Sequence, residues 1–495
     1  MNTHDRTSTP FALHMNAIRA ALLAFVSLLA PAGLAAQSAV AITNVDVVDV
    51  RTGSLLEDHT VLVVGGRIRS VEPTAGAAVL DGTTVIDGTD RYLMPGLWDM
   101  HAHLRHPMAP IVLMPQLIAH GVTGVREMAS GCDGPPDQQP EGSVCLPEML
   151  EWRAQIERGE LLGPRLLALS SFPLNPPWDF EVTEEMARGL VGMLDEQGAD
   201  LLKVYYRMSP ETFGWIADEA EHRGLDVAGH LPMRMTTAEA AAAGLRSVEH
   251  ARDLLFDCFP GAAEWRRTAM SQNPPTDVMR AMVEDHDPVM CEATYRTLVD
   301  HDTWYVPTHV TRRMDAYADD PDFRNDPRRK YIPAEVWEEW QEDADKMVAL
   351  DSTPEGRRTM RGFYEMGLEI TGRAHEAGVM ILLGTDGGDT YVFPGSGVHD
   401  ELAELVKAGL TPAEALAAAT IRPAEFLGLD DEFGTVEPGR HADLVLLGAN
   451  PLDGIAHTRD VEAVIFRGEV YNRGELDAML EGVTAGIATM DGDGD

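Results

Sequence analysis

Positive charge is scarce in this sequence, and most of it comes from arginine. Of 495 residues, 39 are basic and 80 are acidic, so the formal net charge is −41. The only lysines are Lys203, Lys330, Lys346 and Lys407. A surface this acidic repels nucleic acid and anionic lipid, so we expect neither as a partner.

Long apolar runs are missing as well. One apolar run, residues 20–30, follows Arg19 and is followed by small residues up to Ala36. The run is too short to favour a membrane span, and the pattern is typical of a signal peptide over residues 1–36. We therefore expect an exported protein, periplasmic or secreted, without a membrane anchor after cleavage.

Cysteine is rare, and its positions leave the pairing open. The four cysteines form two local pairs, Cys132 with Cys145 and Cys258 with Cys291. Export makes disulfides possible, and four cysteines allow three connectivities. A bond in the first pair would close a loop rich in proline, glycine and glutamine. Four free thiols are the alternative, because spacing alone does not decide pairing.

Both ends of the mature chain alternate apolar and polar residues between glycine and aspartate turns. The pattern covers residues 40–90 and returns at residues 442–447 and 461–468. Alternation with a period of two predicts antiparallel strands. We therefore expect one small β-sandwich domain, built from residues 37–95 and 434–475.

Between residues 96 and 433, short apolar runs alternate with helical segments. Several runs end at a residue able to bind a metal ion: His103, Lys203, His230, His250 and Asp386. The other runs cover residues 121–127, 164–170 and 304–308. Eight parallel strands can close into a barrel whose active site lies at the carboxyl ends of the strands. The predicted fold class is α/β, a (β/α)8 TIM-like barrel beside the β-sandwich.

Some connecting segments carry signals of their own. Thr411 and Glu414 form a capping box that predicts a helix start. Residues 253–303 and 315–351 exceed ordinary barrel connections, so we expect helical insertions near the mouth that select the substrate. The acidic tail, residues 476–495, is expected to be disordered.

The most informative motif is His101-Ala102-His103, which ends an apolar run. Residues two apart in a strand face the same side, so both imidazoles can reach one metal ion. Two structural histidines are the alternative interpretation.

These motifs together resemble the metal-dependent amidohydrolase superfamily. The matching segments are residues 95–103, 203, 230, 247–250, 384–386 and 437–445. They extend over essentially the whole mature chain. They are most similar to the imidazolonepropionase-like and Xaa-Pro dipeptidase-like (prolidase-like) branch, and to ochratoxin-hydrolysing amidohydrolases.

The resemblance implies a binuclear metal centre. Its ligands would be His101, His103 and Asp386 for one divalent ion, and His230 and His250 for the other. Lys203, carboxylated by CO2 on its amine, would bridge the two ions. Zn²⁺ suits these donors, and manganese, cobalt or iron could take the same ligands. An ordinary strand-end lysine and a helix N-cap are the alternative roles of Lys203 and Asp386.

Catalysis by metal-activated hydroxide follows from the same resemblance. Asp386 would accept the proton of the attacking water and deliver it to the leaving nitrogen. Tyr205 lies two residues beyond Lys203, so it shares the inward face and is a candidate donor to the oxyanion. Core packing explains Tyr205 equally well.

Several residues beyond the strand ends are candidates for contact with substrate. They are Arg105, His106, Arg207 and His309. The first three could pair with a substrate carboxylate, whereas a solvent-exposed loop position is the alternative for His309. Asp389 and His399 follow the last strand, and helix capping accounts for either. The resemblance makes His441 structural.

The predicted activity is hydrolysis of amide bonds in Xaa-Pro dipeptides or N-acyl amino acids. One alternative is a cyclic amide or lactone hydrolase, or a deaminase, of the same superfamily. Another is a non-catalytic barrel that only binds. The expected partner is a small-molecule or peptide substrate, and a homo-oligomer is expected from the resemblance only.

Overall fold

The computed structural model describes residues 39–79, 81–132 and 144–492. The predicted signal peptide, residues 1–36, lies outside these ranges. Across the described ranges, no helix combines the length and the apolar character that a membrane crossing requires.

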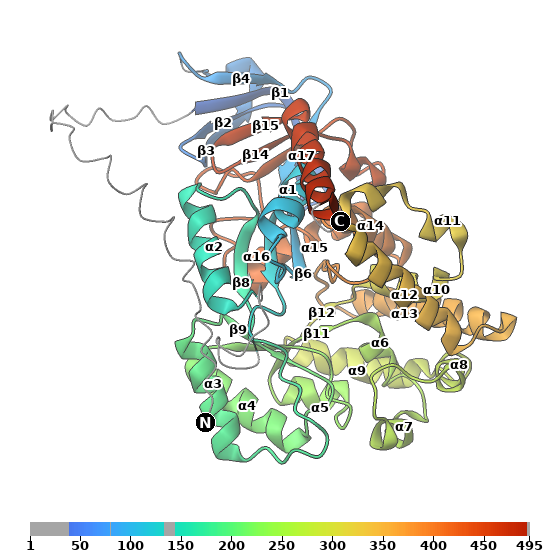
Figure 1. The fold of residues 1–495 in the computed structure, drawn as a ribbon. Helices are drawn as coiled ribbons and strands as arrows, with labels where there is room; N and C mark the ends of the chain where they lie inside the picture. Colours follow the sequence, from blue (N-terminus) through green and yellow to red (C-terminus); the bar gives the residue numbers. More distant parts are fainter. Residues whose placement is uncertain (1–38, 80, 133–143, 493–495) are drawn as a thin grey trace, which may run out of the picture. The chain divides into compact units, whose positions relative to one another are not determined.

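Strands from both ends of the chain form one eight-stranded sheet (Figure 1). Its strands are β1 (Ala39–Asp49), β2 (Ser54–Val64), β3 (Arg67–Pro73), β4 (Thr84–Asp87), β5 (Tyr92–Pro95), β13 (Leu444–Leu447), β14 (Val461–Phe466) and β15 (Glu469–Asn472). The order is β15-β14-β13-β5-β1-β2-β3, with β4 paired to β1. The predicted union of the two ends is therefore present. The two facing sheets of a sandwich are not confirmed, because β5 pairs with both β1 and β13 and joins all eight strands into one sheet.

Seven parallel strands form two further sheets. One contains β6 (Leu97–Ala102), β7 (Val122–Glu127) and β8 (Arg165–Leu169), and the other contains β9 (Leu201–Val204), β10 (Asp226–Gly229), β11 (Leu245–Glu249) and β12 (Trp304–Val306). Single parallel bridges join them, from Ser170 to Leu201, from Tyr305 to Ile381 and from Ala102 to Gly387. Residues 380–387 thus lie where the eighth strand is predicted. The parallel core is confirmed, but a continuous closed barrel is not, because residues 380–387 contribute only single bridges.

Helices pack around the parallel strands (Figure 1). They are α1 (Met114–Ala119), α2 (Leu146–Arg158), α3 (Glu184–Glu196), α4 (Pro210–Arg223), α5 (Thr237–Ala242), α13 (Pro354–Glu376), α14 (Ser396–Lys407), α15 (Pro412–Ala418) and α16 (Ile421–Phe426). The predicted capping box is confirmed, since the Thr411 side chain accepts from the Glu414 backbone N–H at the start of α15.

Both long connections are helical, as predicted. The first holds α6 (Ala251–Leu255), α7 (Ala262–Thr268), α8 (Thr276–Glu284) and α9 (Pro288–Asp300); the second holds α10 (His309–Tyr317), α11 (Pro321–Arg324) and α12 (Ala334–Leu350). The tail expected to be disordered instead forms α17 (Arg473–Gly492), beside α1 in Figure 1. Val483 and Ile487 pack on Val112, and this apolar stripe outweighs the acidic composition.

Both local cysteine pairs form disulfides, Cys132 with Cys145 and Cys258 with Cys291. The alternative of four free thiols is therefore wrong in this structure. The second bond joins the segment that follows α6 to α9, so it links two parts of the first insertion.

A buried ion pair connects β8 to the terminal sheet. Arg165 donates from Nε to one carboxylate oxygen of Asp443 at 2.6 Å and from Nη2 to the other at 3.3 Å. Asp443 directly precedes β13 and is 5 % exposed. The motif around residue 443 is thus a structural joint between the two parts of the fold.

We expect Asp443→Ala to lower the free energy of unfolding by about 3 kcal/mol, because it leaves the buried Arg165 charge with only the half-exposed Glu157 as partner. Urea denaturation measures the change. Glu432→Ala, which breaks the exposed pair with Arg67, is the control and is expected to cost less than about 1 kcal/mol. Equal losses in the two variants would contradict the joint.

Candidate metal centre at the ends of the parallel strands

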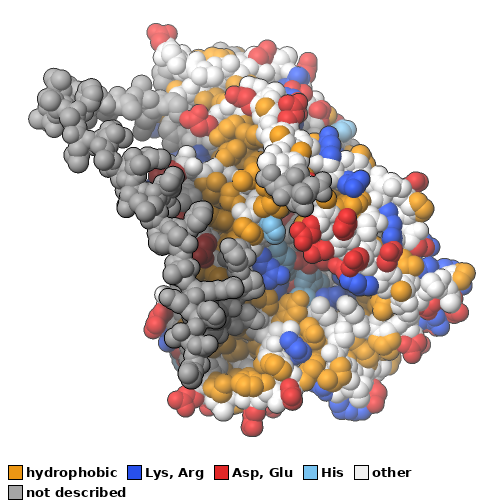
Figure 2. All heavy atoms as spheres, in the orientation of Figure 1, with side chains coloured by type: hydrophobic (Ala, Val, Ile, Leu, Met, Phe, Trp, Pro, Cys, Tyr) orange, Lys and Arg blue, Asp and Glu red, His pale blue; other side chains and the backbone are white. Residues whose placement is uncertain are grey.

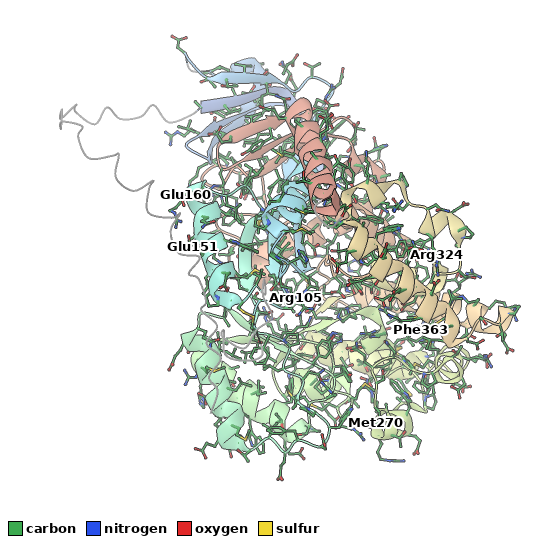
Figure 3. All side chains as sticks on the ribbon, in the orientation of Figure 1. Arg105, Glu151, Glu160, Met270, Arg324 and Phe363 are labelled. Carbon is green, nitrogen blue, oxygen red and sulfur yellow. A yellow bond between two sulfur atoms is a disulfide. The ribbon has the colours of Figure 1, made fainter. Side chains whose placement is uncertain are left out.

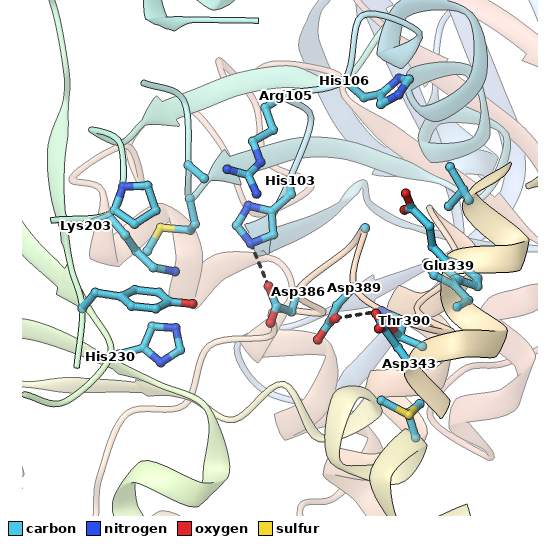
Figure 4. A pocket seen from close by; sticks show the side chains of 18 of the residues that line it. His103, Arg105, His106, Lys203, His230, Glu339, Asp343, Asp386, Asp389 and Thr390 are labelled. Carbon is cyan, nitrogen blue, oxygen red and sulfur yellow. Dashed lines mark hydrogen bonds and ion pairs between the residues drawn. The ribbon is translucent and has the colours of Figure 1, made fainter. Parts of the chain in front are cut away.

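The two histidines of the His-Ala-His motif meet Asp386 at the end of β6. The Nε2 atoms of His103 and His101 lie 2.8 and 3.3 Å from Asp386 Oδ1, and Figure 4 shows the first contact. One ligand atom from each of the three residues lies within 4.8 Å of the others. The backbone N–H of Asp386 donates to the His101 carbonyl at 2.7 Å, which fastens the two segments together.

The Asp99 side chain accepts hydrogen bonds from both segments that meet here. Its carboxylate accepts from the backbone N–H of Thr385 at 2.9 Å, from the Thr385 hydroxyl at 2.5 Å and from the His101 N–H at 3.1 Å. Asp386 has a φ of 61°, a conformation that a non-glycine residue adopts only when its surroundings enforce it. Asp99 supplies that support.

A second histidine pair lies beside the first. His230 follows β10 and His250 follows β11, and their Nε2 atoms are 3.1 Å apart. The Nδ1 atom of His250 lies 2.9 Å from the Thr308 hydroxyl and 3.7 Å from Asp386 Oδ2. Burial lowers the pKa of both histidines well below its ordinary value. Both imidazoles are therefore neutral, which is the form that binds metals.

Lys203 on β9 completes the group. Its Nζ lies 3.0 Å from His101 Nε2, and the residue is 2 % exposed. No carboxylate among the described residues forms a salt bridge with this amine. Burial lowers the pKa of Lys203 to about 8, which favours the neutral amine more than in an exposed lysine.

Glu249 fixes the orientation of His101. Its carboxylate lies 2.7 Å from His101 Nδ1 and accepts from Arg126 Nη2 at 2.8 Å and from the Ser247 hydroxyl at 2.5 Å. Burial opposes ionisation of Glu249, but Arg126 and these hydrogen bonds hold its pKa at about 2. The His101 Nδ1–H therefore donates to Glu249, and the lone pair on Nε2 faces the centre. The sequence motifs indicate no role for Glu249 and Arg126, because pairing between residues of two different strands leaves no local signal.

The donor chemistry of this cluster fits divalent metal ions. It combines imidazole nitrogens with an ionised carboxylate, the set that zinc and similar metals prefer. The imidazoles of His101, His230 and His250 are neutral, whereas Asp386 and Glu127 raise the pKa of His103 to about 9, so a metal ion would displace the proton of His103. Carboxylate and hydroxyl partners on the outer nitrogens of His101 and His250 resemble the second layer of hydrogen bonds around bound metals. All six predicted ligands are brought together at one place.

A cavity of about 1340 Å³ opens over this cluster. Figure 2 shows a hollow with histidine and basic side chains inside it and acidic side chains along one border. Tyr205 lines the cavity with its ring 4.0 Å from that of His230. Arg105, central among the side chains in Figure 3, also lines it.

The other candidates for substrate contact divide into two groups. His106 and Arg207 line the cavity, although Arg207 already donates to the Asn175 carbonyl at 3.0 Å. His309 is fully buried outside the cavity lining, with Nε2 3.0 Å from the Thr371 hydroxyl. The predicted substrate contact and its alternative, an exposed loop position, are therefore both wrong. The start of α10 is held by Glu401, which accepts from the His309 backbone N–H at 2.9 Å.

Three further residues considered from the sequence, His399, His441 and Asp389, lie in different surroundings. His399 is buried between Thr458 and the His120 carbonyl, and His441 stacks on Phe433. Both are structural. Asp389 lines the cavity, and burial together with the negative charge of Asp386 raises its pKa to about 6.

A family model, related sequences and solved structures each match most of this chain. The family model described as "Amidohydrolase family" matches residues 92–471. An uncharacterised protein of Mycobacterium bovis is 25% identical over 436 residues, which cover 84% of this chain and 94% of that protein. The structure of a Bifidobacterium longum protein assigned as a prolidase has 25% identity and a TM-score of 0.62, covering 90% of this chain and 99% of that one. The ochratoxinase of A. niger shares the fold, with 18% identity and a TM-score of 0.58 over 88% of this chain and 96% of that one.

Proposed function

Because this chain belongs to the amidohydrolase family, we propose that it is an exported, binuclear metal-dependent hydrolase that cleaves the amide bond of Xaa-Pro dipeptides or N-acyl amino acids. The match to the family model confirms the resemblance that the sequence motifs indicate. Export is supported by the signal-like pattern of residues 1–36, and the substrate class by the likeness to the Bifidobacterium longum protein.

The observation that carries the proposal is the position of Lys203. Its buried amine lies 3.0 Å from a ligand nitrogen of His101 and lines the same cavity as His230 and Asp386. A neutral lysine amine adds CO2 and releases one proton, which leaves a carbamate anion on the side chain. A carbamate offers two oxygens and can bridge two cations, whereas a free ammonium cannot bind either.

In this proposal His101, His103 and Asp386 hold one ion and His230 and His250 the other, with Lys203 between them. Two divalent ions, most suitably Zn²⁺, would lower the pKa of a water molecule and polarise the substrate carbonyl.

Protein side chains would handle the protons. Burial opposes ionisation of Asp386, but the histidines around it hold its pKa well below the ordinary value, so the carboxylate is available as a base. It would take a proton from the attacking water at its carboxylate oxygen and pass it to the leaving nitrogen. Burial raises the pKa of Tyr205, so its phenol keeps the proton that it would donate to the developing oxyanion.

A substrate panel tests the proposed function. Xaa-Pro dipeptides, N-acyl amino acids, lactones and adenine would be offered to Zn²⁺-loaded protein and to chelated protein. We expect cleavage of the first two classes by the loaded protein, loss of activity on chelation and recovery when Zn²⁺ is restored.

Other outcomes would contradict this function. Ring opening or ammonia release without cleavage of the linear amides would favour the cyclic amide hydrolase or deaminase. Silence across the panel in every metal state would favour the barrel that only binds.

A further inference from the structure

A buried arginine lies next to the candidate metal centre. Arg252 is on α6, two residues beyond the ligand His250, and is 5 % exposed. It lines the same cavity as Lys203, His230 and Asp386. Arg252 and the candidate ligands therefore border one cavity.

The guanidinium of Arg252 has few protein partners. Nη1 donates to Asn273 Oδ1 at 2.8 Å, whereas the buried Nε has no hydrogen-bond partner. The nearest carboxylate oxygen, Asp253 Oδ1, is 3.5 Å from Nε, and the other oxygen of Asp253 accepts from the Leu231 N–H. An arginine has five N–H donors, and burying them without acceptors is unfavourable.

A second arginine faces the same cavity. Arg312 on α10 donates to Asp315, and its positive charge lies close enough to influence Arg252. The negative charges of Asp253 and Asp315 equal the positive charges of Arg252 and Arg312 in number. A missing acceptor is therefore indicated by the unpaired N–H donors of Arg252 and not by an excess of positive charge. A ligand with two adjacent oxygens would satisfy them.

The cavity is polarised around this point. Glu339 and Asp343 on α12, with Asp389, lie on the side away from His230 and Lys203 (Figure 4). Lys346 compensates the charge of Asp343 at 2.9 Å, so Glu339 and Asp389 supply the negative charge that repels an anionic group from this side. Arg252, which lines the cavity with His230 and Lys203, offers it a favourable place.

Resting on the proposed function, we propose that Arg252, oriented by Asn273, binds the carboxylate of the amino-acid part of the substrate. A guanidinium matches a carboxylate with two parallel N–H···O bonds. The enzyme then prefers acyl amino acids and dipeptides with a free carboxylate over amidated or neutral analogues. Asn273 belongs to the first insertion, so this segment takes part in substrate selection.

The test compares binding of matched acids and amides. The probes are N-acetyl-L-proline, N-acetyl-L-leucine and N-acetyl-L-methionine, each with its primary amide, titrated calorimetrically into Zn²⁺-loaded protein. In the parent we expect at least one acid to bind about 10- to 100-fold more tightly than its amide, as a hydrogen-bonded charge pair provides.

Variants assign the preference to the residue. Arg252→Met is expected to bring the acid-to-amide ratio close to one, and Asn273→Ala to reduce it by a smaller factor. Arg361→Met, on the surface beside Asp319, is the control and keeps the parent ratio. Should Arg252→Met fail to fold, Asn273→Ala and Arg252→Lys carry the test, since both are expected to lower the ratio.

The outcomes separate this inference from the proposed function. No preference for any acid in the parent, or a preference that survives in the Arg252 and Asn273 variants, overturns the carboxylate site. A preference that depends on Arg252 without hydrolysis of any amide supports the site and overturns the hydrolase. Hydrolysis of an amide together with equal binding of acids and amides supports the hydrolase and overturns the carboxylate site.

Discussion

Asp386→Asn is expected to lower kcat by about three orders of magnitude while most metal binding is retained. An asparagine oxygen can still face His101 and His103, but an amide neither accepts the proton of the attacking water nor returns it to a leaving nitrogen. The structure fixes the residue from several sides, through its own N–H to the His101 carbonyl and through Thr385 to Asp99. We therefore expect the loss to be chemical rather than conformational.

Steady-state kinetics beside elemental analysis of the purified protein measure both parts of this prediction. Asp389→Asn is the matched control, because it alters a cavity carboxylate three residues away; its kcat is expected to fall by less than about ten-fold. If Asp386→Asn stays within that same margin, the carboxylate does not handle the proton.

Lys203→Ala is expected to reduce the metal content from two equivalents to one or fewer and to abolish measurable turnover. Alanine offers no atom to join the two histidine sets, and the four imidazoles and Asp386 then have to hold two cations without a shared anion. Elemental analysis of protein prepared with bicarbonate and Zn²⁺ gives the stoichiometry.

Two comparisons sharpen the Lys203 experiment. Lys330→Ala removes a lysine outside the metal-site cavity and is expected to keep the parent metal content. Acetate added to Lys203→Ala supplies a small carboxylate, which is expected to restore part of the turnover. One equivalent of metal in the parent, unchanged by the substitution, would make Lys203 structural and favour mononuclear deaminase-like chemistry.

The clustering of the candidate ligands could be predicted from sequence because each of these residues ends a short apolar run. Strand periodicity places His101 and His103 on one face, and parallel packing brings their strand end beside those of Lys203 and His250. These are local signals, and the structure brings all the named ligands together. The eighth predicted strand, residues 380–386, forms only single bridges, because periodicity does not determine whether an apolar run pairs along a continuous ladder.

Other features depend on contacts that no local pattern records. Glu249 orients His101 only because Arg126 and Ser247 reach it from β7 and β11. His309 follows a strand in sequence, yet the start of α10 turns it toward α13 and away from the cavity. The acidic composition of the tail predicts disorder, but Val483 and Ile487 pack against Val112 and stabilise a helix there. No local pattern identifies Arg252, because the segment that follows His250 has no recognisable spacing.

The central place of β5 has a consequence for the order in which the protein is assembled. This strand lies between β1 and β13, and it leads through Gly96 directly into β6 and the His-Ala-His motif. The Gly96 N–H donates to the Asp443 carbonyl at 2.8 Å, and a Cβ at Gly96 would collide with Thr123. During synthesis β5 therefore lacks one neighbour until residues 444–447 have left the ribosome. The strand that leads into the His-Ala-His motif therefore gains its second neighbour only after nearly 350 further residues have been made, so the candidate metal site is joined to a complete terminal sheet late in synthesis.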